Sequence, residues 1–136
     1  MPFRARYNKF DYQGSLHTKG PFTVKSGEAI TQGMLCKYTS GEVEPADAGD
    51  VFAGWAQSDA AAGDTDLMLY DIDVAMGISD GYARVDGAAI DVASGSQGIE
   101  ATTKTNYDLV VVESSTATEE TRVMVHPKNT LYYTAS

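Results

Sequence analysis

After about residue 25, strand-sized apolar runs alternate with short polar turns along the chain. Glycine, often beside Ser, Asp or Asn, interrupts the sequence at short intervals, and helical periodicity is nearly absent. The clearest pattern is at residues 65–76, where every second residue from Met68 to Met76 is apolar, while the intervening positions change from leucine to Asp71 and Asp73. This pattern predicts an all-β fold with one long strand that runs from the core to the rim.

Two further apolar runs near the C-terminus predict a hairpin. Residues 107–114 (YDLVVVES) are apolar on both faces, as in a strand that is covered on both sides. Residues 121–127 (TRVMVHP) form the second strand, after the polar turn SSTATEE. Residues 82–101 predict two or three shorter strands. We therefore expect residues 78–127 to enlarge the body or to form a small additional β-subdomain.

The first 25 residues differ from the rest of the chain in charge and in periodicity. Residues 1–25 have a formal charge of +4 and residues 26–136 have −13, which gives the net charge of −9. Five of the twelve Phe and Tyr residues lie in this segment without a periodic apolar stripe: Phe3, Tyr7, Phe10, Tyr12 and Phe22. A segment that buries little surface cannot offset an ordering cost of about 1–2 kcal/mol per residue. We therefore expect residues 1–25 to be an extended arm that orders on a partner, and residues 26–136 to be the all-β body.

Composition narrows the class of protein further. A chain of 136 residues has the size of one domain with a core of its own. The single cysteine, Cys36, excludes an intramolecular disulfide, and we expect it to be a small buried apolar residue and not a reactive thiolate. No apolar run has the length of a membrane helix or of a signal peptide. The negative charge of the body disfavours binding to the phosphates of nucleic acid. We expect a protein that binds neither membranes nor nucleic acid.

Residues 28–77 contain an ordered series of strands and turns. A strand at 29–38 turns at 39–41, a short strand at 42–44 stops at Pro45, the strand VFAGWAQ follows, and residues 59–64 lead into the long strand. In VFAGWAQ, Gly54 permits a close backbone approach beside Trp55, which we expect in the core. This order resembles that of the lambda-type head decoration proteins of tailed bacteriophages, in which a start-up strand, a short read-back strand, a Gly-containing strand and a long strand follow one another.

The resemblance implies a capsid decoration, or cement, protein that is not an enzyme and needs no cofactor. It implies a small β-barrel or β-tulip-like body, made in the cytoplasm of a bacterial host and bound to the outer surface of the virion. There it would bridge major capsid subunits and stabilise the expanded head, acting as a homotrimer or, alternatively, as a dimer. The family also has an N-terminal arm that orders on the capsid. In this chain the arm residues expected at the capsid are Phe3, Arg4, Arg6, Tyr7, Lys9, Phe10 and Tyr12.

Patterns for catalysis or for metal binding are incomplete in this sequence. His17 and His126 are the only histidines, and no motif such as G-x-S-x-G indicates a nucleophile beside them. Asp71 and Asp73 share a face of the predicted long strand and are the nearest candidates for a Ca²⁺ site, although no complete calcium motif surrounds them. We expect no resident metal, and we expect the acidic pairs at 47/50 and 64/66 to be solvated loop residues.

Other interpretations stay open. Basic and aromatic residues alternate in the arm as they do in binders of single-stranded nucleic acid, and the arm is alternatively an edge strand of its own body. A small β-barrel module that binds carbohydrate or a receptor would use Asp71 and Asp73 at its ligand site. A small all-β hydrolase would need a site centred on His17 or His126.

Overall fold

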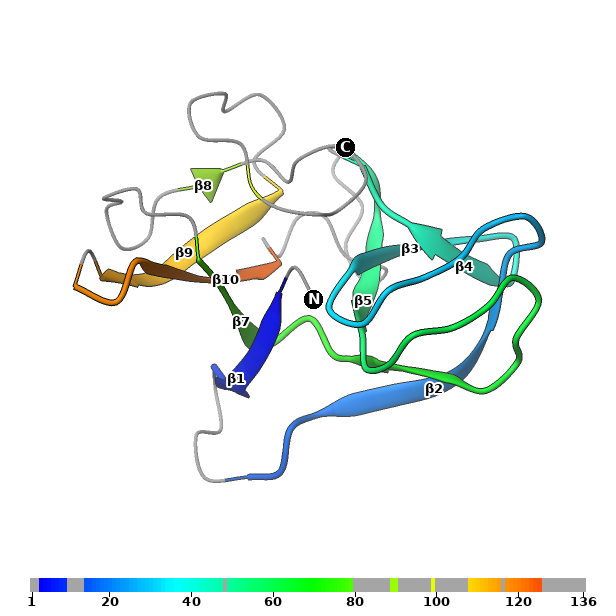
Figure 1. Ribbon diagram of the computed structural model, residues 1–136, viewed down its shortest axis with the longest axis horizontal. Helices are drawn as coiled ribbons and strands as arrows, with labels where there is room; N and C mark the ends of the chain where they lie inside the picture. The colour runs from blue at the N-terminus through cyan, green and yellow to red at the C-terminus, as the bar shows by residue number, and fades with distance from the viewer. Residues whose placement is uncertain are drawn as a thin grey trace.

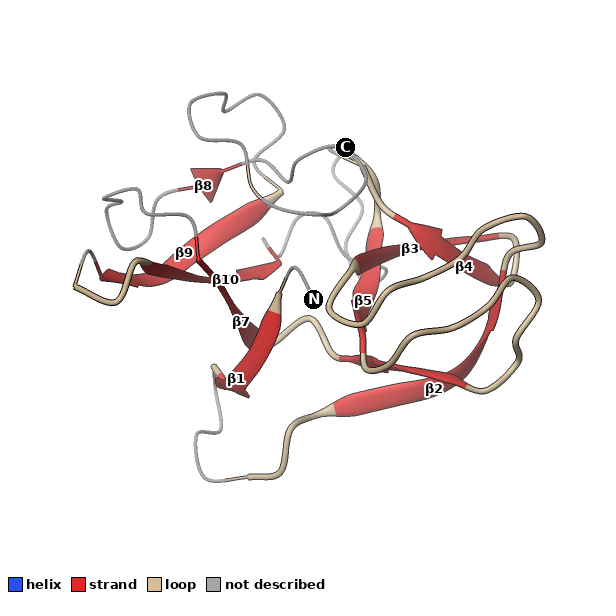
Figure 2. Cartoon of the chain, in the orientation of Figure 1, coloured by secondary structure: helices blue, strands red, loops and turns tan. Residues whose placement is uncertain are grey.

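The computed structural model describes residues 3–9, 14–47, 49–79, 89–90, 99, 108–115 and 117–125. The regular secondary structure of these residues is β throughout (Figure 2), and none of them forms a helix long and apolar enough to cross a membrane. The strands are β1 (Arg4–Asn8), β2 (Thr18–Val24), β3 (Leu35–Thr39), β4 (Glu42–Pro45), β5 (Phe52–Ala56), β6 (Leu67–Tyr70), β7 (Val74–Ser79), β8 (Ala89–Ile90), β9 (Leu109–Ser115) and β10 (Glu120–Val125).

The strands form a closed barrel and an open sheet, which lie side by side (Figure 1). The barrel has the strand order β2-β4-β3-β5-β6, and the open sheet has the order β1-β7-β10-β9-β8. The pair β2 and β4 is parallel, and the other pairs are antiparallel. The small all-β barrel expected from the sequence is therefore confirmed.

Two apolar clusters stabilise the fold, one inside the barrel and one between the barrel and the open sheet. Strand β5 contributes to both, because Ala53 and Ala56 lie in the barrel cluster while Phe52 and Trp55 lie in the second cluster. We call the second cluster the interlayer core. Its members from the open sheet and from the residue before β1 are Phe3, Val74, Met76, Leu109, Val111, Val123 and Val125. Burial on both faces explains why every residue of β5 is buried.

Trp55 and Gly54 have the roles that the sequence predicts. Trp55 is fully buried, and its ring centroid lies 4.7 Å from that of Phe3. Gly54 has a φ of 156°, and a Cβ at this position would lie 2.3 Å from the carbonyl oxygen of Tyr70. A glycine is therefore required where β5 passes β6, since only a residue without a side chain permits this approach.

The single long strand predicted at residues 65–76 is wrong. Strand β6 ends at Tyr70 and β7 begins at Val74, and a turn between them moves the chain from the barrel to the open sheet. In this turn the Val74 amide donates to the Asp71 carbonyl over 3.0 Å. Leu67 and Leu69 of β6 are buried in the barrel cluster, whereas Val74 and Met76 of β7 are buried in the interlayer core. Asp71 and Asp73 therefore do not share the face of one strand.

The prediction that residues 1–25 bury little of their own surface is also wrong for the described part of that segment. Strand β1 pairs with β7 in the open sheet, and β2 pairs with β4 and β6 in the barrel. Phe3 and Val24 are fully buried, one in each apolar cluster. The alternative of an edge strand of its own body is thus what residues 4–8 adopt. The body accordingly begins before residue 26.

The C-terminal hairpin is confirmed, with one difference. Strands β9 and β10 pair antiparallel as predicted, and their described residues belong to the open sheet that shares the interlayer core with the barrel. The two faces of β9 are covered unequally, because Leu109 and Val111 are buried whereas Val110 and Val112 on the other face are half-buried. The start-up strand is also shorter than expected. Strand β3 begins at Leu35, and Ile30 before it forms an isolated bridge with Ala60.

Candidate functional site

Strand β1 is an edge of the open sheet and forms one wall of an apolar pocket. Among the described strands its only neighbour is β7, so no described strand pairs with its other edge. The pocket has a volume of about 260 Å³ and lies between the open sheet and the barrel. We call it the seam pocket. Its apolar walls come from Phe3, Ala5, Leu16, Ala56, Tyr70 and Met76.

Two polar residues also line the seam pocket. Arg4 is exposed and belongs to β1, and Gln32 is half-buried and belongs to the loop before β3. The Gln32 amide donates to Asp59 Oδ1 over 2.7 Å, which fixes the backbone of this loop against the loop that follows β5. The lining of the pocket is thus mainly apolar, and one cationic residue and one polar residue take part in it.

Arg4 differs from most other cationic residues of the described chain. Seven Lys and Arg residues are described, and five of them make ion pairs with carboxylates: Arg6, Lys19, Lys25, Lys37 and Arg122. Arg4 and Lys9 make no ion pair with a described carboxylate, and they lie at the start of β1 and just after its end. In a chain with a net charge of −9, unpaired positive charge on the described surface is therefore concentrated at this strand.

The face of the open sheet opposite the barrel has a network of paired charges. Arg6 donates from Nε and Nη2 to the two Glu120 oxygens over 3.1 Å and 2.6 Å, and Arg122 donates from Nε to Glu120 Oε1 over 2.8 Å. Arg122 and Tyr7 both donate to Glu113. These bonds join β1, β9 and β10 across β7. Their effect is to hold β1 on the sheet.

Gly77 of β7 makes room for this network. A Cβ at Gly77 would lie 2.6 Å from Glu120 Oε1 and 3.0 Å from Arg6 Nε. The hydrogen bond from Arg6 lowers the pKa of Glu120 below its ordinary value, against the opposing effect of burial, and the bond from Arg122 adds to the shift. Burial and the neighbouring Glu113 raise the pKa of Tyr7. Tyr7 and Arg6 therefore serve to attach β1 to its own sheet.

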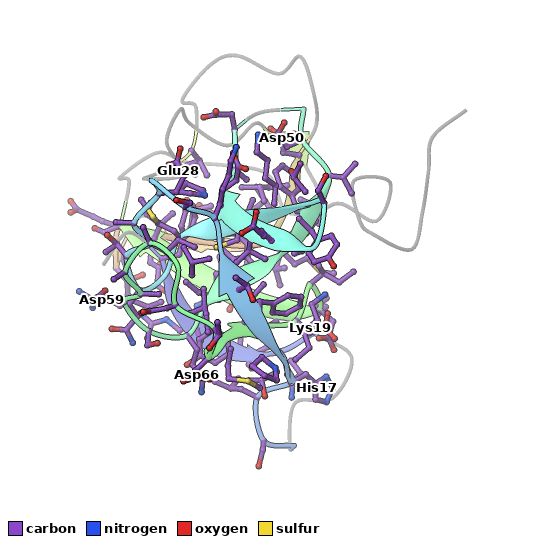
Figure 3. The ribbon with its side chains drawn as sticks, turned by 90° about the vertical axis from the view of Figure 1, so that its right-hand side faces the viewer. His17, Lys19, Glu28, Asp50, Asp59 and Asp66 are labelled. Carbon is purple, nitrogen blue, oxygen red and sulfur yellow. The ribbon has the colours of Figure 1, made fainter. Side chains whose placement is uncertain are left out.

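Asp71 and Asp73 hold the two connections between the barrel and the open sheet together. His17 Nδ1 lies 2.7 Å from Asp73 Oδ2, and Lys19 Nζ lies 3.2 Å from Asp71 Oδ1. The Lys9 amide donates to the Asp73 carbonyl over 2.8 Å. Figure 3 shows His17 and Lys19 together near one end of β2, with Asp50 and Glu28 at the opposite end of the barrel. Asp71 is thus ion-paired with Lys19, and Asp73 contacts the His17 ring in a structural role.

The other acidic pairs of the sequence have local structural roles. Asp50 Oδ2 accepts from the Asp47 amide over 2.8 Å and lies 3.3 Å from Lys37 Nζ. Asp64 Oδ2 accepts from the Ala61 amide over 2.9 Å. No group of three or more metal-ligating side chains occurs among the residues that the structure describes. These aspartates shape turns, as short side chains with carboxylate oxygens commonly do.

Two further features are the buried thiol of Cys36 and a polar pocket at the tip of the β9–β10 hairpin. Cys36 is fully buried in the barrel, and burial raises the pKa of its thiol to about 12, so its expected role as a small apolar residue is confirmed. A polar pocket of about 250 Å³ lies at the hairpin tip. It is lined by Glu113, Ser114, Ser115, Thr118, Glu120 and Arg122.

The structure brings together only part of the predicted site. Arg4, Arg6, Tyr7 and Lys9 lie on or beside β1, while Phe3 is buried in the interlayer core. The predicted site residues Phe10 and Tyr12, and the candidate His126, lie outside the described residues. Sequence reasoning missed Leu16 and Met76 of the seam pocket, because nothing in a linear pattern indicates that a loop residue before β2 and a residue of β7 meet.

The fold and the site define an all-β protein in which a small closed barrel is packed against an open sheet, with a basic edge strand beside an apolar pocket. No protein-family model matches this chain, and no curated protein matches it either.

Proposed function

We propose that this protein is a capsid decoration protein, which binds the outer surface of a tailed-phage head and stabilises it by bridging neighbouring major capsid subunits. The observation that carries the proposal is the order of strands β3, β4 and β5 within residues 28–77, which resembles the start-up, read-back and Gly-containing strands of the lambda-type decoration proteins. The long strand of that order is divided here into β6 and β7. The block of residues 28–77 supplies the barrel strands β3 to β6 and leads into β7, beside which the basic strand β1 forms a sheet edge. The proposed docking element is thus attached to the block that carries the resemblance.

Docking through β1 in its present position is favoured over docking through a detached arm. Detachment would expose Phe3, and burial of a Phe side chain is worth about 1.5–3 kcal/mol. It would also break the pairing with β7 and the bidentate contact of Arg6 with Glu120. An added strand on the outer edge of β1 avoids these losses, because it uses backbone groups that no described strand engages.

A single docking edge of this length gives weak binding. Net contributions of about 0.5–1.5 kcal/mol per hydrogen bond, over the few bonds that five residues offer, fall well short of the roughly 8 kcal/mol of micromolar affinity. Several linked copies would multiply the gain through effective concentration. We therefore include in the proposal that the protein acts as a homotrimer, with a dimer as the alternative.

The test is co-sedimentation of the full-length protein with expanded heads of the parent phage from which the decoration protein has been removed. Saturable binding at a fixed ratio to capsid subunits is expected, together with a higher temperature for release of the packaged DNA. The absence of saturable binding would exclude the proposed function. Binding without any effect on heat release would exclude the stabilising role.

A second candidate function is carbohydrate binding by an accessory module of the virion. The sequence suggested Asp71 and Asp73 as its site, but Asp71 is ion-paired with Lys19 and Asp73 contacts the His17 ring. The observation that favours this candidate is instead the polar pocket at the β9–β10 tip, with Ser114, Ser115 and Thr118 in its lining. Binding of soluble glycans that is lost on replacement of Thr118 by Val, while head binding is absent, would select this candidate.

A further inference from the structure

We propose that the seam pocket and Arg4 together bind an extended acidic peptide segment, which places one aromatic or branched aliphatic side chain in the pocket and a carboxylate against Arg4. That this segment belongs to a capsid subunit rests on the proposed function. The binding chemistry itself rests on the pocket, on the charge distribution and on the edge of β1 that no described strand pairs with.

The size and lining of the pocket favour a single side chain over a small-molecule ligand. Its volume of about 260 Å³ is below the range of roughly 300–1,000 Å³ that is usual for ligand pockets. Apart from Arg4 and Gln32, its lining side chains are apolar or, in Tyr70, aromatic. A cofactor or sugar would require more converging polar groups than this pocket has. An apolar side chain is the occupant that its walls fit.

The charge at the pocket selects an acidic segment. Arg4 lines the pocket, is exposed and makes no ion pair with a described carboxylate. The other described cations of the barrel and the open sheet are held by carboxylates of this chain, apart from Lys9. A carboxylate is the natural partner of an unpaired guanidinium, with which it forms charge-assisted hydrogen bonds.

Strand geometry explains how one segment satisfies both features. Phe3 and Ala5 pack toward the interlayer core, and both line the pocket. A strand added to the outer edge of β1 would lie about 4.8 Å from it, with alternate side chains on opposite faces. Its inward side chain would then lie beside Ala5 and enter the pocket. The next side chain would point to the other face, within reach of Arg4, where an opposite charge is favourable.

A peptide titration tests the binding chemistry without the capsid. The probe is a short acetylated and amidated peptide in which Asp alternates with Phe and Val, and its partner probe has Lys in place of Asp. Methyl signals of Ala5, Leu16, Ala56 and Met76 are followed by NMR on the full-length protein. Saturable shifts of these methyl groups are expected with the Asp peptide, with affinity about tenfold or more above that of the Lys peptide. Equal affinity for both probes, or shifts confined to other methyl groups, would overturn the proposal.

Variants separate the pocket from general electrostatics. Arg4→Glu is expected to weaken binding of the Asp peptide about tenfold or more, whereas Lys9→Glu makes the same charge change away from the pocket and should weaken it about threefold or less. Ala5→Leu fills the pocket and should abolish the shifts. Gln32→Glu is a near-isosteric second variant that should also weaken the Asp peptide, even if Ala5→Leu fails to fold. Equal effects of Arg4→Glu and Lys9→Glu would overturn the role of the pocket.

Head binding then distinguishes this inference from the proposed function. If the wild type binds the Asp peptide but not expanded heads, the pocket is upheld and the capsid role fails. If the wild type binds heads and Arg4→Glu binds them equally well, the capsid role is upheld and the pocket fails as the contact. Sedimentation of the free protein tests whether a second copy of this chain occupies the seam pocket. Loss of self-association in Arg4→Glu, with head binding unchanged, would overturn the inference in favour of a contact between copies.

Discussion

His17 Nδ1 lies 2.7 Å from Asp73 Oδ2, and this contact joins the two places where the chain passes between the open sheet and the barrel. One passage leads from β1 to β2, and the other from β6 to β7. The Lys9 amide bonds to the Asp73 carbonyl and the Asp71 amide bonds to the His17 carbonyl, each over 2.8 Å. Barrel and sheet are thus connected at this corner by side-chain and backbone contacts as well as by the interlayer core.

The His17–Asp73 contact should contribute a small, measurable coupling energy. Both side chains are partly exposed, at 42% and 22%, so we expect about 0.2–1 kcal/mol in a double-mutant cycle with His17→Gln and Asp73→Asn. The measurement is the free energy of unfolding in urea. As a control, His17→Gln and Asp59→Asn should be additive within about 0.5 kcal/mol, because Asp59 binds the Gln32 loop. If the effects of His17→Gln and Asp73→Asn on the free energy of unfolding were additive, the contact would not stabilise this corner.

Gly54→Ala should destabilise the protein strongly. Its φ is unfavourable for alanine, and the new Cβ would meet the Tyr70 carbonyl at 2.3 Å, so we expect a loss of about 3 kcal/mol or more. Gly63→Ala is the matched control, because Gly63 also has a positive φ, of 85°, but has no atom near the added Cβ. The control should lose only about 1 kcal/mol. Equal denaturation midpoints for the two variants would contradict the close approach of β5 and β6.

Phe3→Ala should destabilise β1 more than it destabilises the strands of the barrel. The ring is fully buried against Trp55, and removal of a buried Phe side chain typically costs about 3–5 kcal/mol. We expect faster amide exchange in β1 than in β5, with a change in Trp55 fluorescence. Phe22→Ala is a suitable comparison, because Phe22 is only partly buried and packs on the barrel cluster. If Phe3→Ala left the stability and the Trp55 signal unchanged, β1 would not be part of the body in solution.

Stability should decrease in acid partly because of Glu120. Its pKa is lower in the folded protein than in the unfolded chain, so the unfolded chain binds more protons as the pH falls. The stabilisation is therefore fully present above the ordinary pKa of a glutamate and is lost as the pH falls through the lowered pKa. Glu120→Gln should flatten the dependence of unfolding free energy on pH between about pH 6 and pH 3. A profile parallel to that of the wild type would contradict the assignment.

Cys36 should be unreactive in the folded protein. Burial raises its pKa to about 12, so almost no thiolate is present near pH 8. A thiol-specific disulfide reagent should therefore modify Cys36 only as fast as the protein opens, and urea should accelerate the reaction. Rapid labelling under native conditions would show that the barrel interior is open to solvent.

Much of the local structure could be predicted from the sequence. The alternation of apolar and polar residues and the frequent glycines predict the all-β class, the β9–β10 hairpin and the strands around Glu42 and Trp55, because these patterns depend on neighbours in the chain. Gly54 and Trp55 in adjacent positions also indicate a strand with a close backbone approach. Burial of Cys36 follows from its apolar strand.

The assignment of strands to two sheets depends on tertiary structure. Residues 65–76 alternate without interruption, but the turn at Asp71–Asp73 sends β6 and β7 to different sheets, and a period of two is the same in both. Likewise, the basic and aromatic residues of β1 show no periodic apolar stripe in the sequence. Phe3 is buried because β7 pairs with β1 and Trp55 packs against the Phe3 ring. The seam pocket exists only because Ala5, Leu16 and Ala56, which are remote in sequence, meet where the barrel packs on the open sheet. Local pattern thus predicts which residues form strands, whereas long-range packing decides which faces these strands share.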